Sequence, residues 1–323
     1  DLMVAMRSSP FGSYGHMMAD QNTFNILSKG EKTFYRSGYK VDMNDPHRLG
    51  WYKHTKGNNG ILMDGQGQPF STDAFGMLTR FVQNDQLAYV KGDASFAYQS
   101  EETKENYGLK KFNRHIVLLQ PNTLVIYDEL EAEKPVKWSW LIHSHQKIEM
   151  DSVNQTFTSQ FEKSFGKATL WSSSPVNWNL TGSFEIAAVN VIHRKDEDGD
   201  VMEFHDNQWH FKAENPEKTN KIRFLSIIQF SETAKKTAPL KSTDSAGKKE
   251  IAFGKWRISA TMDPNTFGQL TITNTDNTTE FHATTQSENG PTVLKSQKNG
   301  KLQIVEQLDQ LPTSMKNLLL YEK

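Results

Sequence analysis

The 323-residue sequence contains no cysteine. Disulfide bonds and thiol nucleophiles are therefore excluded, and cysteine usage does not indicate a redox compartment. The sequence also lacks any run of about 18 apolar residues, which excludes a membrane-spanning helix. The first residues, DLMVAMRSSP, have neither a basic region nor a long apolar stretch, so they do not form a signal peptide. Because they begin within a strand-like run, we expect the chain to be part of a longer one.

An excess of charge of either sign is also missing. The chain has 37 Lys and Arg against 38 Asp and Glu, which gives a formal net charge of −1 at pH 7. No general electrostatic field therefore attracts nucleic acid or a membrane surface. We expect neither as a partner, and an acidic ligand would need a local binding site.

A helical period is nearly absent, and strand-like patterns fill the sequence. Residues 109–130 contain two β-rich runs joined by Gln-Pro-Asn, which predicts a hairpin. In residues 136–150, Trp138 and Trp140 alternate with polar residues, which predicts a half-buried strand. Only residues 309–323 offer a short turn of helix. Many strands with closely spaced turn signals predict stacked antiparallel sheets.

The polar, lysine-rich stretch SETAKKTAPLKSTDSAGKKE at 231–250 interrupts the strand signals. It predicts a linker or long loop, which we assign to residues 233–249. The expected fold class is all-β. A large antiparallel two-layer β-sandwich occupies residues 1–232, and a smaller β-sheet module occupies residues 250–323.

Three short motifs suggest metal or phosphate chemistry, but each also fits a structural role. His143 and His145 form the only H-x-H pair, and on a strand they would share a face and could ligate a metal. No third ligand follows at a suitable spacing, so a structural role is favoured. DEDGD at 196–200 lacks the ligand spacing of a calcium loop, and GQGQ at 65–68 is not followed by a helix. Both predict turns.

The first 70 residues concentrate aromatic, amide and histidine side chains beyond the needs of a sheet. Aromatic faces stack on sugar rings, while amides and arginine bind hydroxyls and carboxylates. The pattern predicts a sugar-binding surface, although long loops at the edge of a sandwich are polar as well. The candidate substrate-binding residues are Arg7, Tyr14, Gln21, Asn22, His54 and Asn59.

Three separated stretches match a known pattern in the same order. They are SSPFGSYGHMMADQNTFNILSKGEKTFYRSGY at 8–39, PHRLGWYKHTKGNNGILMDGQGQ at 46–68, and GDAS with AY at 92–98. The sequence resembles the β-sandwich region of the heparinase II/III-like polysaccharide lyases. The resemblance implies an acidic polysaccharide substrate and a periplasmic or secreted location. It also implies a partner, an N-terminal α-helical toroid that completes the active cleft and is missing from this sequence.

The resemblance implies catalysis by β-elimination. In this reaction a tyrosine or histidine removes the C5 proton of a uronate, and a tyrosine commonly protonates the leaving oxygen. His16 matches the first histidine of the family motif, and Tyr39 ends the RSGY stretch, so both are candidate catalytic residues. The toroid would supply the principal base. We therefore expect the isolated chain to be weak or inactive.

The resemblance further implies that the zinc ligands of the family are replaced. The three positions hold Met18, Arg36 and Asn58. A cation at Arg36 would oppose a metal, and a thioether is a poor zinc ligand beside oxygen donors. We expect no metal cofactor, with the Arg36 side chain beside Met18 and held by Asn58 or a carboxylate. A shift in register that uses His47 and His54 is the alternative.

Two other functions fit the same residues. Replacement of a whole ligand set is also expected of a non-catalytic carbohydrate-binding or scaffold module with the same fold. A hydrolase would need a carboxylate pair, for which Asp20 and Asp64 are available, but their separation does not follow from the sequence.

Overall fold

The computed structural model describes residues 2–188, 208–284, 292–298 and 300–308. These residues form four main antiparallel sheets and a ribbon of β7 (Gln99–Ser100) and β8 (Glu105–Asn106). Over the same ranges, the helical elements are three short turns, and none is long enough to span a membrane. They are η1 (Arg48–Tyr52), η2 (Thr55–Gly57) and η3 (Ala234–Lys236). The prediction of an all-β fold is confirmed.

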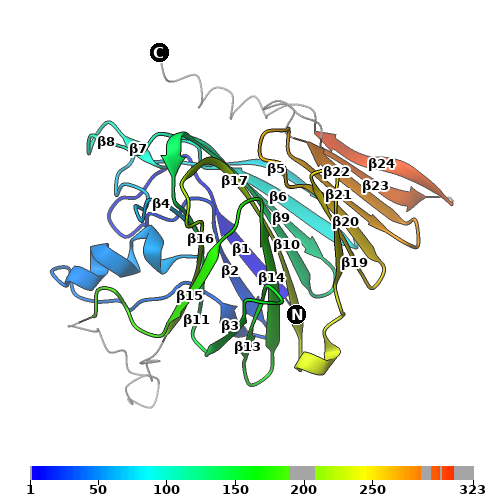
Figure 1. Cartoon of the computed structure of the whole chain (residues 1–323), viewed down its shortest axis with the longest axis horizontal. Coiled ribbons are helices and arrows are strands. Elements are labelled where there is room, and N and C mark those ends of the chain that lie inside the picture. Colours follow the sequence, from blue (N-terminus) through cyan, green and yellow to red (C-terminus); the bar gives the residue numbers. More distant parts are fainter. Residues whose placement is uncertain (1, 189–207, 285–291, 299, 309–323) are drawn as a thin grey trace.

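An eight-stranded sheet lies at the centre of the molecule (Figure 1). Its longest strands pair along the whole hairpin predicted around Gln-Pro-Asn, with Leu119 opposite Thr123. In spatial order the strands are β12 (Ile148–Asp151), β13 (Thr156–Gln160), β14 (Phe165–Ser172), β17 (Thr219–Ser231), β10 (Thr123–Val136), β9 (Leu109–Leu119), β6 (Leu87–Asp93) and β5 (Met77–Gln83).

One face of this sheet packs against two smaller sheets and completes the sandwich. Alternate residues such as Leu124 and Ile126 point into this core, where they meet Phe24, Trp138 and Trp140. The three-stranded sheet contains β1 (Leu2–Arg7), β2 (Thr23–Ser28) and β3 (Glu31–Phe34). The four-stranded sheet has the order β15 (Asn177–Thr181), β16 (Trp209–Glu214), β11 (Trp138–Ser144) and β4 (Ile61–Met63).

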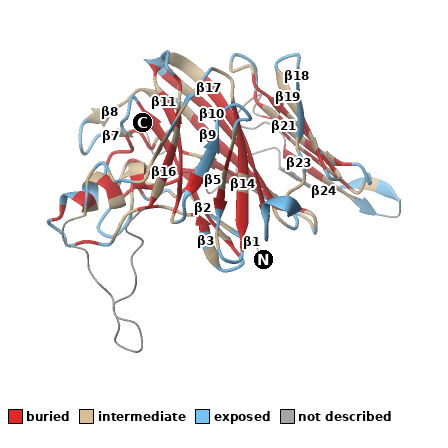
Figure 2. Ribbon diagram, turned by 60° about the horizontal axis from the view of Figure 1, so that its bottom comes forward, coloured by how far each residue is buried: buried red, intermediate tan, exposed pale blue. Residues whose placement is uncertain are grey.

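The other face of the central sheet is covered by a seven-stranded sheet. Val125 and Tyr127 point to this side, and the Tyr127 hydroxyl donates a hydrogen bond to the Thr261 carbonyl at 2.7 Å. Buried residues therefore line both faces of the central strands (Figure 2). The strands are β18 (Lys241–Ser245), β19 (Lys248–Phe253), β20 (Trp256–Thr261), β21 (Gln269–Asn274), β22 (Thr279–Thr284), β23 (Thr292–Lys298) and β24 (Lys301–Leu308).

A buried ion pair links the central sheet to the chain segments that precede β2 and β4. Arg114 and Asp128 stand directly opposite each other on β9 and β10, and both are fully buried. The guanidinium contacts both carboxylate oxygens, at 2.7 and 2.9 Å, and also donates to the carbonyls of Asn22 and Asn59. Trp140 donates its indole N–H to the same carboxylate at 3.1 Å. This network holds the chain at Asn22 and Asn59, just before β2 and β4.

Two sequence-based expectations about local structure are wrong. The predicted linker at 233–249 contains η3, β18 and the start of β19, and its strand β18 is exposed along its whole length. An exposed edge strand buries no apolar face, so its sequence shows no alternation. The strand expected to be half-buried, β11, is buried on both faces because η1 and residues 183–185 cover its outer side. The motif at 196–200 and the expected helical turn at 309–323 lie outside the described residues.

Candidate functional site

The loop between β1 and β2, residues 8–22, carries the candidate catalytic histidine. Gly15 precedes His16 with a φ of +55°, a left-handed conformation that glycine adopts without strain. At the base of the loop, the amide of Gly12 donates to the Thr72 carbonyl at 3.0 Å. A Cβ at Gly12 would overlap the Ser71 carbonyl oxygen, so only glycine permits this close approach. The loop is thereby attached to residues 71–72 as well as to its own strands.

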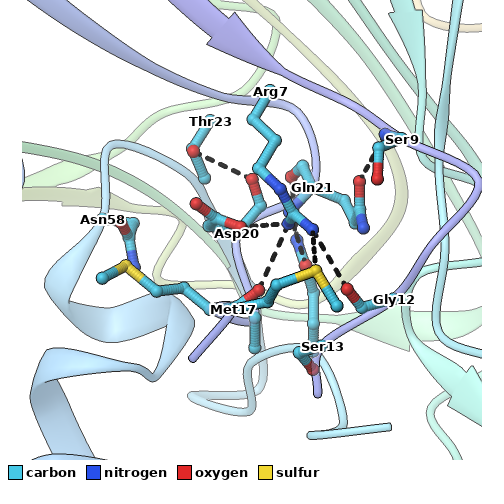
Figure 3. Close-up of polar contacts among 12 residues, drawn as sticks. Arg7, Ser9, Gly12, Ser13, Met17, Asp20, Gln21, Thr23 and Asn58 are labelled. Atoms are coloured by element: carbon cyan, nitrogen blue, oxygen red, sulfur yellow. Dashed lines mark hydrogen bonds and ion pairs between the residues drawn. The ribbon is translucent and has the colours of Figure 1, made fainter. Parts of the chain in front are cut away.

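Arg7 holds the loop from inside (Figure 3). Its guanidinium forms an ion pair with Asp20 and donates to the carbonyls of Met18, at 3.2 Å, and Gly12, at 3.0 Å. Burial raises the pKa of Asp20, and the charge and hydrogen bond of Arg7 offset this only in part. The Lys53 ammonium donates to the carbonyl of Gly15. Arg7 was predicted to bind substrate, but its guanidinium instead forms hydrogen bonds with the loop that carries His16.

Three other predicted substrate-binding residues lie in the interior. Gln21 forms paired hydrogen bonds with Gln68 at 2.8 and 2.9 Å. The amide of Asn22 donates to the carbonyls of Gly92 and Phe112, and that of Asn59 donates to the Phe24 carbonyl. Gln21, Asn22 and Asn59 are all almost completely buried. Their geometry assigns them to holding the main chain in place, so we do not carry them forward as residues that contact a glycan.

His16 and Tyr14 lie at the surface of the loop. The Tyr14 side chain is 69% exposed, and His16 is exposed as well. In the part of the chain that the structure describes, the imidazole of His16 makes no hydrogen bond. A fixed loop with a free imidazole at its surface can present that imidazole to a ligand.

Of the three positions Met18, Arg36 and Asn58, the structure brings Arg36 into contact with Met18. One guanidinium nitrogen of Arg36 lies 2.8 Å from the Met18 sulfur, and another donates to the Tyr52 hydroxyl at 3.2 Å. Arg36 is thus hydrogen-bonded to Tyr52, whereas the expected partner was Asn58 or a carboxylate. Asn58 instead donates its amide to the His54 carbonyl at 2.9 Å.

A cleft of about 620 Å³ borders this contact. Tyr39, Arg36, Tyr52, His145 and Gln208 belong to its walls. Arg36 lies 4.8 Å from the centre of the Tyr52 ring, so the cleft combines aromatic faces with a positive charge. Because Arg36 also contacts Met18, the loop that carries His16 borders the cleft wall that carries Tyr39.

The alternative metal pair, His47 and His54, is already engaged. Both ring nitrogens of His47 are used, one by the Ile186 carbonyl at 2.5 Å and the other by the Tyr39 amide at 3.1 Å. His54 accepts a hydrogen bond from the Lys56 amide at 3.0 Å and caps η2, and burial lowers its pKa to about 4. His54, also a predicted substrate-binding residue, is half-buried. Within the described ranges, no three His, Asp or Glu side chains gather in a metal-binding group.

The carboxylate pair considered for a hydrolase is divided between separate interactions. Asp20 pairs with Arg7, whereas Asp64 is on an exposed turn and pairs with Lys218 at 2.9 Å. Asp64 also accepts a hydrogen bond from the Lys137 amide. This turn is the predicted GQGQ turn, closed by a bond from the Gln66 amide to the Met63 carbonyl.

A second cavity, of about 390 Å³, lies on the outer face of the four-stranded sheet. His143 on β11 and His210 on β16 face each other across the strands and line it. Burial lowers the pKa of both, to about 4 for His210 and well below the ordinary value for His143. His145 lines the first cleft instead, so the H-x-H pair is split between two cavities. The sequence alone did not indicate that His210 lies opposite His143, because this depends on the register between β11 and β16.

The comparisons place the chain among known proteins. A profile of the family described as heparinase II/III-like, C-terminal, matches residues 1–253. The chain belongs to this family. No curated protein matches it.

Solved structures of heparinase III and of a heparan sulfate lyase share the fold. A heparinase III with methylated lysines superposes with a TM-score of 0.60 at 12% identity, over 88% of this chain and 38% of that one. Heparan sulfate lyase HepC from Pedobacter heparinus superposes with a TM-score of 0.59 at 13% identity, over 78% of this chain and 38% of that one. A HepC mutant gives 0.60 at 13% identity, over 96% and 40%. The chain thus spans about two fifths of the length of these structures.

Proposed function

We propose that this chain forms the sandwich wall of a polysaccharide lyase cleft that cleaves uronic-acid-containing glycans of the heparin, heparan sulfate or alginate type. The observation that carries the proposal is the exposed His16 on a loop whose carbonyls are bound by Arg7 and Lys53. A catalytic group that meets its substrate at a surface must be held in place by its surroundings, and this loop meets that requirement. Membership of the heparinase II/III-like family supports it.

The proposed chemistry is β-elimination. The principal base of the cleft takes the C5 proton of the uronate, a C4=C5 double bond forms, and the C4–O bond breaks. His16 and Tyr39 are the acid–base side chains that this chain contributes to the cleft. The leaving oxygen then takes up a proton from an acid in the cleft. Arg36 lines the cleft, and its positive charge favours the uronate carboxylate as negative charge develops beside C5.

The remaining wall of the cleft is assigned to an N-terminal α-toroid in the parent protein. The solved relatives are more than twice as long as the part that this chain covers, which leaves room for such a domain. In this proposal the toroid provides the principal base, and the protein acts in the periplasm or outside the cell. The isolated chain is expected to be weak or inactive.

The test compares this chain with its parent protein on heparan sulfate, heparin and alginate, using the ultraviolet absorbance of the unsaturated uronate product. We expect cleavage by the parent, and a loss of about 10²- to 10⁴-fold in His16→Ala. His282→Ala is the matched control, because His282 is on the seven-stranded sheet, away from the cleft, and should leave the rate unchanged. Equal rates for His16→Ala and the parent would exclude His16 from catalysis.

A non-catalytic carbohydrate-binding module is the second candidate. The contacts of Arg36 with Met18 and Tyr52 favour this function. They engage the Arg36 guanidinium within the protein, which leaves fewer of its donors for a substrate. For this function the parent protein would bind the glycans without releasing unsaturated product, and His16→Ala would change binding little.

A further inference from the structure

Two histidines that line the cavity on the outer face of the four-stranded sheet each have one ring nitrogen without a hydrogen-bond partner among the described residues. The two nitrogens are Nδ1 of His143 and Nε2 of His210, both buried, in side chains that are 1% and 4% exposed. A buried polar atom without a hydrogen bond destabilises the folded state. Two such atoms on directly paired residues are candidates for contact with a ligand.

We propose that His143 and His210 bind a divalent transition-metal ion of the kind that prefers imidazole, such as Zn²⁺, Ni²⁺ or Cu²⁺. This site is separate from the cleft of the proposed function and does not depend on it. The two histidines are opposite each other on neighbouring antiparallel strands, so the backbone fixes their separation without help from a loop.

The hydrogen bonds of the two rings leave the right atoms free. His143 donates its Nε2–H to the Asn58 carbonyl at 3.2 Å, and His210 donates its Nδ1–H to the Ser183 carbonyl at 3.2 Å. In a neutral imidazole the other nitrogen then carries a lone pair. Metal-binding histidines in proteins show this arrangement, with the second N–H bonded to a carbonyl that orients the ring.

The spacing of the rings suits a shared metal ion. A zinc ion about 2.1 Å from a ring nitrogen lies roughly 3.2 Å from the ring centre, so two rings at a tetrahedral angle have centres about 5.2 Å apart. The centres of His143 and His210 are 5.2 Å apart, with an angle of 78° between the ring planes. This separation of the ring centres is compatible with two imidazoles bound to one ion.

The surroundings of the pair also permit a cation. Trp51 and Phe184 pack against His210, with ring centres 4.7 and 5.0 Å away, and restrict its ring. At the mouth of the cavity, Lys56 is paired with Glu185 at 2.9 Å, and Lys212 lies 3.3 Å from Glu214. These pairs neutralise both lysines, so the mouth presents little net repulsion. Two protein ligands leave the remaining coordination positions to water.

The experiment titrates the untagged full chain with Zn²⁺ by isothermal calorimetry and with Cu²⁺ by electron paramagnetic resonance. We expect one Zn²⁺ site per chain and a Cu²⁺ spectrum with coupling to two imidazole nitrogens. His210→Phe keeps an aromatic ring beside Trp51, and His143→Gln keeps a donor for the Asn58 carbonyl. Each should weaken Zn²⁺ binding at least tenfold, whereas the control His282→Gln should not change it.

Circular dichroism spectra establish that the variants remain folded. Equal Zn²⁺ affinity in all variants would place the metal at surface histidines and overturn the proposal. Absence of binding in the wild-type chain would also overturn it and assign the two nitrogens to a bridging water or an organic ligand.

Discussion

Two arginine–aspartate pairs use the same chemistry in different surroundings. Arg114 and Asp128 are completely buried, whereas the side chains of Arg7 and Asp20 are 27% and 14% exposed. Each guanidinium also donates to carbonyls of the loop that carries His16: Arg114 reaches its last residue, Asn22, and Arg7 reaches its middle. The fully buried pair therefore lies in the core of the sandwich, whereas the partly exposed pair contacts the loop. The difference separates what stabilises the fold from what shapes the site.

The largest effect is expected from the buried pair. Arg114→Met removes the partner of Asp128 and leaves a buried carboxylate without its ion pair, which should lower the free energy of unfolding by about 3–5 kcal/mol. Urea denaturation followed by tryptophan fluorescence measures it. The double variant Arg114→Met/Asp128→Leu removes both charges and should recover part of the loss. A loss below about 1 kcal/mol in the single variant would mean that the pair does not hold the sandwich.

A second and smaller effect is expected at His54, whose contribution to the free energy of unfolding should be lost in mild acid. Folding lowers the pKa of His54 to about 4 from an ordinary value of 6.5, mainly through burial. The unfolded chain therefore binds the proton more tightly. The contribution of neutral His54 is fully present above pH 6.5 and is lost as the pH falls from 6.5 to 4, up to about 3 kcal/mol.

His54→Asn tests this contribution because asparagine keeps an acceptor for the Lys56 amide but does not titrate. The free energy of unfolding, measured by urea denaturation between pH 7 and pH 4, should fall less steeply in the variant. Parallel curves for the two proteins would show that His54 is not the group that titrates.

The smallest effect on global stability is expected from the exposed pair. Arg7→Met should lower the free energy of unfolding by about 1 kcal/mol or less, because a partly exposed ion pair contributes little. It should instead speed amide hydrogen exchange in residues 11–20, measured by mass spectrometry. The exposed Lys147→Met, which removes a cation elsewhere, is the control. Unchanged exchange in Arg7→Met would show that the loop is held by its other contacts.

Much of the fold followed from the sequence, because alternation and turn chemistry are local signals. The hairpin at Gln-Pro-Asn and the turn at GQGQ are both present. Strand β18 was missed because an exposed edge strand buries no face, and the burial of both sides of β11 depends on elements far away in the chain.

The site could be predicted only in part. The approach of Arg36 to Met18 followed from the resemblance, but the sequence could not show that Gln21, Asn22 and Asn59 point inward. Polar residues in a loop look alike in a sequence whether they bind a ligand or the main chain. His143 and His210, 67 positions apart, face each other only through strand register.

The contact between Arg36 and Met18 has a consequence for how the loop keeps its shape. A bound ion has an occupancy, which changes with its concentration and with competing chelators. The Arg36 guanidinium is part of the chain, so every folded molecule has this positive group beside Met18. The contact between Arg36 and Met18 is therefore a property of the folded chain itself.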